Sequence, residues 1–189
     1  ISNLEFARQC EIMPMTASRF FNISMGFFNS EFERLGDDRW IIRNREQLNT
    51  LRFDTATTKS VDFVHSQGVI GQRHYQGSLY IALDATVAEP VVALRSHASI
   101  LSAPPREERP YLLHGRWRVE ALSYNNDVTS FVTEGFGAGE MQWVVPLERS
   151  YRINAKGVNE YVNYDYTVIV EPDSKGLITF VLPPSFERL

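Results

Sequence analysis

The spacing of apolar residues separates a short helical beginning from a long remainder rich in short apolar runs. Residues 2–10 follow helical spacing, and residues 11–15, which include a proline, predict a buried extended segment. A second helix is expected from a cap at Thr16 or Ser18, with phenylalanines at spacings of three and four, to its end near Gly36. Residues 1–38 therefore resemble a helix-strand-helix remnant of an upstream α/β domain, which would not bury its own faces.

Beyond residue 38 the pattern changes to short runs with strand character, separated by turn signals and by a looped or short helical stretch at 61–65. Strands are expected at residues 39–43, 48–53, 79–83, 91–94, 97–101, 117–124, 128–133, 141–145, 151–155, 162–170 and 177–182. Such regular spacing predicts a mainly β fold over residues 39–189, an antiparallel β-sandwich of jelly-roll type preceded by the two-helix remnant.

Composition narrows the class of protein. The 189 residues are 43% apolar, enough to supply a core, and the net charge of -4 argues against a nucleic-acid-binding surface while leaving local basic patches open. Cys10 is the only cysteine, so no internal disulfide can form. No apolar run is long enough for a membrane span. Because the sequence starts at Ile1 already within a helical pattern, we expect it to be the tail of a larger protein.

Catalytic patterns are absent from the sequence. The four histidines are scattered without metal-ligand spacing, and no Gly-x-Ser-x-Gly motif occurs. The glycine-rich run at 135–139 leads into a strand rather than a helix, so it predicts a wide turn and not a phosphate loop. The carboxylate pairs at 37–38 and 107–108 lie in polar loops. We therefore predict no catalytic residue, no metal ligand and no cofactor.

Aromatic and polar residues on one strand give the candidate binding site. In an expected strand over 116–124, Trp117, Val119 and Ala121 alternate into the core, and the other positions face outward. Sugar rings stack on aromatic side chains while polar neighbours bond their hydroxyls. The candidate ligand-binding residues are Arg116, Arg118, Glu120, Tyr124 and Tyr80. An ordinary solvated sheet face remains the alternative interpretation.

Several segments resemble a known family. Residues 11–20 (Glu-Ile-Met-Pro-Met-Thr-Ala-Ser-Arg-Phe) resemble the last strand and helix of polysaccharide-deacetylase-like barrels. Residues 48–54, 66–71 and 77–83 look like the region that follows this barrel in large periplasmic proteins that modify Pel exopolysaccharide, a biofilm polymer, and combine deacetylase and glycoside-hydrolase-like domains. The resemblance implies a bacterial periplasmic or secreted setting, an amino-sugar polysaccharide as ligand and an upstream catalytic domain in the same chain. No position matches the family's catalytic motifs, so no catalytic residue is carried over.

Three hypotheses follow. The first is a non-catalytic carbohydrate-binding or positioning module beside a polysaccharide deacetylase. The second is an interaction domain that docks export-machinery proteins or packs against the parent's catalytic barrel. The third is a hydrolytic domain whose acids are brought together only by the fold.

Overall fold

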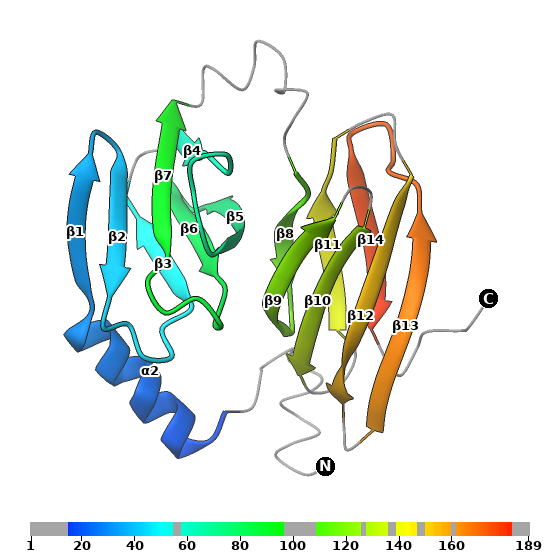
Figure 1. Ribbon diagram of the computed structural model, residues 1–189, viewed down its shortest axis with the longest axis horizontal. Helices are drawn as coiled ribbons and strands as arrows, with labels where there is room; N and C mark the ends of the chain where they lie inside the picture. The colour runs from blue at the N-terminus through cyan, green and yellow to red at the C-terminus, as the bar shows by residue number, and fades with distance from the viewer. Residues whose placement is uncertain are drawn as a thin grey trace.

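The computed structural model describes residues 15–54, 58–96, 109–125, 128–135, 139–146, 150–159 and 162–182. This part of the chain forms one helix and fourteen strands (Figure 1). They are α2 (Ala17–Asn29), β1 (Glu31–Gly36), β2 (Arg39–Arg43), β3 (Thr50–Phe53), β4 (Lys59–Val61), β5 (Val69–Tyr75), β6 (Ser78–Leu83), β7 (Val91–Ser96), β8 (Tyr111–Gly115), β9 (Arg118–Asn125), β10 (Val128–Gly135), β11 (Gly139–Val144), β12 (Tyr151–Asn159), β13 (Val162–Val170) and β14 (Leu177–Leu182). The prediction of a mainly β fold is confirmed.

Three sheets organise these strands, and one of them extends through both halves of the molecule. The six-stranded sheet has the order β14-β11-β8-β5-β6-β3. A four-stranded sheet of order β1-β2-β7-β4 lies over one half of it, and another of order β13-β12-β10-β9 lies over the other half (Figure 1). None of the sheets closes on itself. Each half therefore has two layers with its own core between them.

The core of the first half lies between the sheet that contains β2 and β7 and the strands β3, β5 and β6. It is made of aliphatic side chains and one aromatic ring, which together exclude water from both layers. Its buried members are Ile42, Leu51, Val61, Phe63, Val69, Leu79, Ile81, Leu83, Val92 and Leu94. Tyr111 of β8 stacks on Phe63 with ring centroids 4.7 Å apart, so the second half also contributes a ring to this core.

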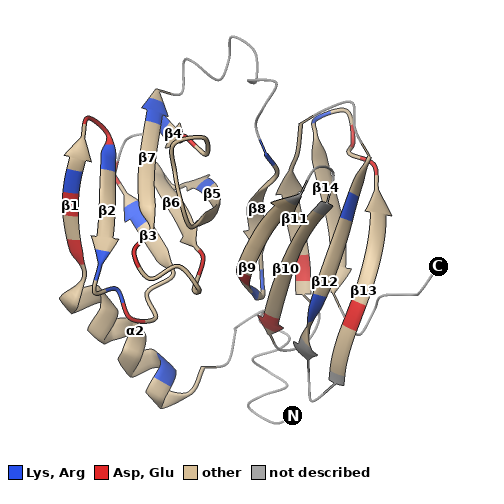
Figure 2. Cartoon of the chain, viewed as in Figure 1, with Lys and Arg blue, Asp and Glu red and all other residues tan. Residues whose placement is uncertain are grey.

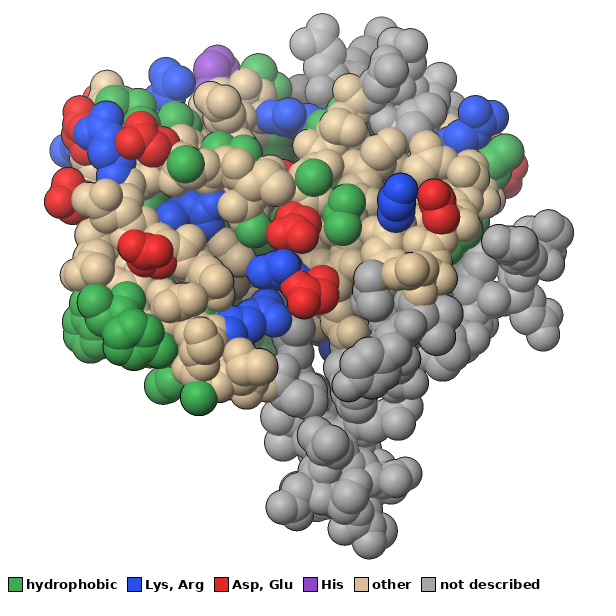
Figure 3. Space-filling view, turned by 60° about the horizontal axis from the view of Figure 1, so that its bottom comes forward, with side chains coloured by type: hydrophobic (Ala, Val, Ile, Leu, Met, Phe, Trp, Pro, Cys, Tyr) green, Lys and Arg blue, Asp and Glu red, His purple; other side chains and the backbone are tan. Residues whose placement is uncertain are grey.

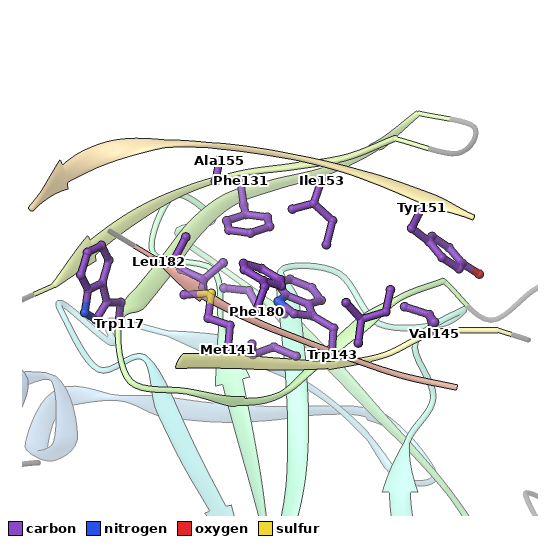
Figure 4. Close-up of a cluster of buried hydrophobic side chains, with 14 residues drawn as sticks. Trp117, Phe131, Met141, Trp143, Val145, Tyr151, Ile153, Ala155, Phe180 and Leu182 are labelled. Atoms are coloured by element: carbon purple, nitrogen blue, oxygen red, sulfur yellow. The ribbon is translucent and has the colours of Figure 1, made fainter. Parts of the chain in front are cut away.

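The core of the second half is built around aromatic rings (Figure 4). Phe131 and Ile153 extend from one layer toward Trp143 and Phe180 of the other layer. The Phe131 and Trp143 rings stack with centroids 5.2 Å apart. Full burial of one such side chain contributes about 2–3 kcal/mol. This core explains the alternation seen in the sequence, because Trp143, Met141 and Val145 all lie inside as expected.

The helix α2 begins as expected, but it ends earlier. The Oγ1 of Thr16 accepts a hydrogen bond from the Arg19 amide at 3.2 Å, which caps the first turn. The expected continuation to Gly36 is wrong, because residues 31–36 form β1 and pair with β2 in a hairpin. Asp38, with φ of 56°, takes the left-handed conformation that closes this hairpin. The hairpin crosses residue 38, where we expected a domain boundary; that division stays a prediction.

Other expectations fall on segments whose structure is not described. The first expected helix at 2–10, the extended residues 11–14, Cys10, the strand at 97–101 and the carboxylate pair at 107–108 lie outside the described residues. The two-helix remnant therefore stays a prediction. The stretch at 61–65 contains the end of β4 followed by a turn.

The expectation of a purely antiparallel fold is wrong at two strand pairs. β10 pairs in parallel with β12 along its whole length, and β5 pairs in parallel with β8. The strands on either side of the glycine-rich run at 135–139, β10 and β11, belong to different sheets, and residues 136–138 lie outside the described residues, so the predicted wide turn stays a prediction. Sequence reasoning missed β1, β4, β5 and β8 altogether.

The six-stranded sheet is continuous because β5 and β8 pair with each other. Gly71 of β5 and Leu112 of β8 are the one pair of residues in strand register between them in the described part of the chain, and Arg73 Nη1 lies 3.1 Å from His114 Nδ1. A Cβ atom on Gly71 would lie 1.9 Å from the Leu112 carbonyl oxygen, so only glycine permits this approach. The glycine that resembled a turn signal is therefore the point at which the two halves of the sheet meet.

A buried carboxylate joins the halves a second time. Asp84 follows β6 and is only 4% exposed. Its two oxygens accept hydrogen bonds from the Ala121 amide at 3.0 Å and the Leu122 amide at 2.9 Å. These amides belong to a bulge in β9, where Ala121 has φ of 53° and the register with β10 shifts. The amide and hydroxyl of Thr86 complete the set of donors to Asp84, at 2.9 and 2.7 Å.

Hydrogen bonding decides the ionisation of Asp84. Burial opposes its negative charge, but the bonds from Thr86, Leu122 and Ala121 together outweigh burial and lower the pKa of the carboxyl. The buried Arg45 guanidinium lies nearby and donates to the Asp84 carbonyl at 2.6 Å and to the Val87 carbonyl at 2.5 Å. Both charged groups therefore hold backbone segments of the junction rather than one another.

We expect Asp84→Asn to lower the free energy of unfolding by about 2–3 kcal/mol, because an amide NH₂ would face donors that now bond a carboxylate. The exposed Asp173, which accepts the Lys175 and Leu177 amides in a turn, is the matched control, and Asp173→Asn should cost clearly less. Urea unfolding followed by tryptophan fluorescence measures both.

The free energy of unfolding should depend on pH differently in the wild type and in Asp84→Asn. Because the folded pKa of Asp84 is below its unfolded value of about 3.9, the charge contributes fully above that pH and its contribution is lost as the pH falls further. The stability gap between wild type and Asp84→Asn should therefore shrink below about pH 4. A gap that stays constant with pH would contradict a structural role for the charge.

We further expect Gly71→Ala to destabilise the protein by about 1–3 kcal/mol, since the added methyl group would push β5 and β8 apart. Gly36→Ala is the control, because a Cβ atom there meets nothing within 4 Å and the residue has no positive φ. Equal unfolding midpoints for Gly71→Ala and wild type would contradict the claim that the close approach of β5 and β8 requires glycine at this position.

Candidate functional site

A hollow of about 290 Å³ lies where α2 and the two halves of the six-stranded sheet meet, and we call it the junction pocket. α2 contributes Arg19 and Ile23, and the segment from β2 to β3 contributes residues 47–50. The strands β5, β6 and β8 supply apolar residues, and residues 116–119 at the start of β9 close the pocket. It therefore combines segments that lie far apart in the sequence.

The lining of the junction pocket is basic and polar around an apolar floor. Three arginines line it, Arg19, Arg116 and Arg118, and its lining includes no acidic residue, lysine or histidine. The apolar lining residues from β5, β6 and β8 are Ile70, Ala82, Leu83 and Leu112, and we call them the floor. Elsewhere basic and acidic residues are interspersed over the strands, so no single charged strip is seen (Figure 2).

Arg118 is positioned by two carboxylates beside the pocket. Its Nη2 lies 2.5 Å from Glu134 Oε2, the residue opposite it on β10, and 3.5 Å from Glu120 Oε2. The Arg118 side chain is 24% exposed and Glu134 is more accessible, so solvent weakens this pairing. The pairs fix the direction of the guanidinium more than they stabilise the fold.

Arg116 and Arg118 flank a buried ring that anchors this part of the chain. Trp117 is 3% exposed and packs between Gly135 and Gly139, where added Cβ atoms would come within 2.1 and 2.6 Å of its ring. The Arg116 amide donates to the Glu140 carbonyl at 3.2 Å. Gly135 and Gly139 therefore make room for the Trp117 indole. The prediction that Trp117 belongs to the core is confirmed.

The bulge in β9 changes which side chains share a face. Val119 lies opposite the buried Thr133, but beyond the bulge Tyr124 lies opposite the buried Thr129. The inward set thus shifts, and Ala121 is exposed instead of buried. The interpretation that Tyr124 faces outward with Arg118 is wrong, because a bulge breaks the two-residue period.

Tyr124 is held inside by its own contacts. Its hydroxyl donates to the Pro110 carbonyl at 2.5 Å, and the Arg109 guanidinium lies 5.3 Å from its ring centroid. Burial raises the pKa of Tyr124. Tyr80 is half-buried on β6, with its ring 6.4 Å from that of Tyr75, and it does not line the junction pocket. Of the predicted site residues, the structure brings Arg116, Arg118 and, through its ion pair, Glu120 together.

A second surface with possible function lies on α2, and we call it the aromatic face. Its members are Phe20, Phe21, Phe27 and Phe28, which are 62–77% exposed. α2 contains no acidic residue, and Arg19 is its one charged residue. A compact apolar cluster marks this surface at the edge of the molecule (Figure 3). Exposed clusters of large apolar side chains are typical of interaction surfaces.

The described ranges contain no group of three or more histidine, cysteine or acidic residues that could hold a metal ion. His65 pairs with one carboxylate among the described residues, and its Nδ1 lies 2.8 Å from Asp62 Oδ2. No helix in the described part of the chain is long and apolar enough to cross a membrane.

No protein-family model matches the chain, and comparisons with curated proteins and with solved structures gave no match either. The junction pocket and the aromatic face are therefore the two features of the chain that bear on its function. Sequence reasoning found Arg116 and Arg118 but missed Arg19 and residues 47–50, because no spacing or motif links these segments before they fold together.

Proposed function

We propose that this chain is a non-catalytic carbohydrate-binding module with a β-sandwich, jelly-roll-like organisation, and that a sugar binds in the junction pocket. The observation that carries the proposal is the lining of this pocket, where polar side chains surround an apolar floor. Saccharide sites combine these features, because hydroxyls need hydrogen-bond partners and the C–H faces of the ring need apolar contact.

The resemblance to Pel-modifying proteins supports a more specific version of this proposal. In it, the module belongs to a periplasmic or secreted polysaccharide deacetylase or glycoside hydrolase and positions an amino-sugar polymer of the biofilm near the catalytic domain. Arginines donate hydrogen bonds to acetamide and hydroxyl oxygens and repel ammonium groups. The N-acetylated form of the polymer therefore fits the pocket better than the deacetylated form.

A binding role is favoured over a hydrolytic role by the chemistry of the lining. Glycoside cleavage uses a pair of carboxyl groups, and metal-dependent deacetylation uses histidines with a carboxylate. The junction pocket is lined by neither histidine nor carboxylate. Glu120 and Glu134 lie next to it but are engaged with Arg118.

The aromatic face favours docking to another protein as a second candidate function. Its occupant in this proposal is a domain that precedes α2 in the same polypeptide. Such a domain would be covalently linked to α2, whose first turn is capped by Thr16, and so would be tethered to the helix that carries the face. Tethering raises the effective concentration and allows a modest apolar contact to persist. Docking to export-machinery proteins would use the same phenylalanines.

The saccharide proposal predicts measurable binding by the 189-residue protein. Isothermal titration with N-acetylated amino-sugar oligomers should give heat, and Arg116→Gln should weaken the affinity about tenfold, since it removes charged donors. Arg34→Gln is the control, because Arg34 lies on β1 and pairs with the exposed Asp37 away from the pocket. No heat at millimolar oligosaccharide, or equal effects of both substitutions, would contradict the proposal. Turnover of a chromogenic acetyl ester or glycoside would support the hydrolytic alternative instead.

The docking proposal predicts a different pattern. The double substitution Phe20→Ser and Phe28→Ser should reduce the fluorescence of an apolar dye bound to the protein and leave sugar binding unchanged, because neither residue lines the pocket. In the parent polypeptide, amide hydrogen exchange in α2 should be slower than in the 189-residue protein, and the double substitution should remove this protection. Equal exchange in both proteins would contradict docking of an upstream domain.

A further inference from the structure

We infer that the junction pocket selects an anionic group on its ligand, a carboxylate or a phosphate ester, and rejects cationic sugars. This inference rests on the proposed saccharide-binding function and adds the charge class of the ligand. It follows from three features of the pocket: the source of its charge, the donors that face it and the apolar floor beneath them.

Positive charge reaches the pocket from independent elements. Arg19 comes from α2, Arg116 from the turn between β8 and β9, and Arg118 from the first position of β9. Of these, Arg118 is balanced by Glu134 and Glu120, which do not line the pocket. α2 carries no acid that would balance Arg19 from within its own helix. The lining therefore presents cationic side chains to a ligand, while the neighbouring carboxylates of Glu120 and Glu134 form ion pairs with Arg118.

The polar groups of the lining are mainly donors. A guanidinium donates and cannot accept. Arg118 Nε is buried and has no hydrogen-bond partner among the described residues. The side-chain Oδ1 of Asn49 already accepts from Arg45 Nη1 at 2.6 Å, so the Asn49 side-chain NH₂ is left to donate. An oxyanion supplies acceptors for these donors, whereas an ammonium group would bring more donors and a repelling charge.

The apolar floor makes the sign of the ligand charge matter. Ile70, Ala82, Leu83 and Leu112 exclude water from one side of the pocket. Charges interact more strongly when less water screens them. Arginine also matches carboxylate and phosphate oxygens with two parallel donors, which a neutral hydroxyl does not reproduce.

The test compares sugars that differ mainly in charge. Four probes are titrated into the 189-residue protein: an oligogalacturonate, an N-acetylglucosamine oligomer, the corresponding glucosamine oligomer and glucose 6-phosphate. We expect the uronate or the phosphate to bind about tenfold more tightly than the neutral oligomer, and the glucosamine oligomer to show no binding. The affinity for the anion should fall as ionic strength rises from about 0.01 M to about 1 M, because salt screens the attraction.

Variants at one position connect the preference to the pocket. Arg19→Gln should weaken anion binding about tenfold and change neutral-sugar binding little. Arg19→Lys keeps the charge but loses the paired donors, so it should retain part of the affinity. Arg34→Gln serves again as the control. The cap of α2 uses the Arg19 backbone amide, which these substitutions leave in place, and circular dichroism checks that the fold is unchanged.

The outcomes separate the two proposals. Equal or tighter binding of the neutral oligomer, or equal losses for both ligand classes in Arg19→Gln, would overturn the charge preference and leave the saccharide function standing. Binding of inorganic phosphate that depends on Arg19, with no sugar bound, would overturn the saccharide function and support the anion site. Absence of any binding would overturn both.

Discussion

The contact on which the rest of this structure depends is the one between the Asp84 carboxylate and the bulge of β9. It fixes the end of β6 against the Ala121 and Leu122 amides, which belong to the other half of the molecule. The bulge in turn reverses the inward and outward positions of β9, so it decides that Arg118 and Glu120 face one way and Tyr124 the other. A buried carboxylate that satisfies backbone donors is costly to replace, because each lost partner leaves a desolvated amide.

The junction pocket results from the way the two halves share one sheet. β5 and β8 pair in register at Gly71 and Leu112 in the described part of the chain. Leu112 itself and Ile70, which precedes Gly71 in β5, form part of the pocket floor. Each half keeps a separate core, so the space between them does not have to be filled by core side chains. A binding site at such a junction can be lined by polar residues without loss of either core.

Local patterns predicted strands well where alternation or a continuous apolar run was undisturbed, and β2, β13 and β14 have the expected limits. They failed where long-range contact overrides local preference. β5 was missed because Gly71 resembles a turn residue, although its role is to let another strand approach. Tyr124 was misplaced because no local pattern in the sequence predicts a bulge in β9 that is held by Asp84, which follows β6. The junction pocket could not be predicted from the sequence, since Arg19 and Arg116 come to line the same pocket only after folding. The family resemblance stays a prediction.

Both candidate sites, the junction pocket and the aromatic face, use side chains of the helix α2. Arg19 and Ile23 of α2 line the junction pocket, and Gly26, one turn further, packs so closely on the Arg45 carbonyl that a Cβ atom would lie 2.1 Å from it. This spacing of four and three residues defines the inner face of α2, while its phenylalanines point away. A helix moves as a rigid unit, so a partner bound to the aromatic face would act on the position of Arg19. Because such coupling is reciprocal, a ligand that orders Arg19 would also favour the docked partner.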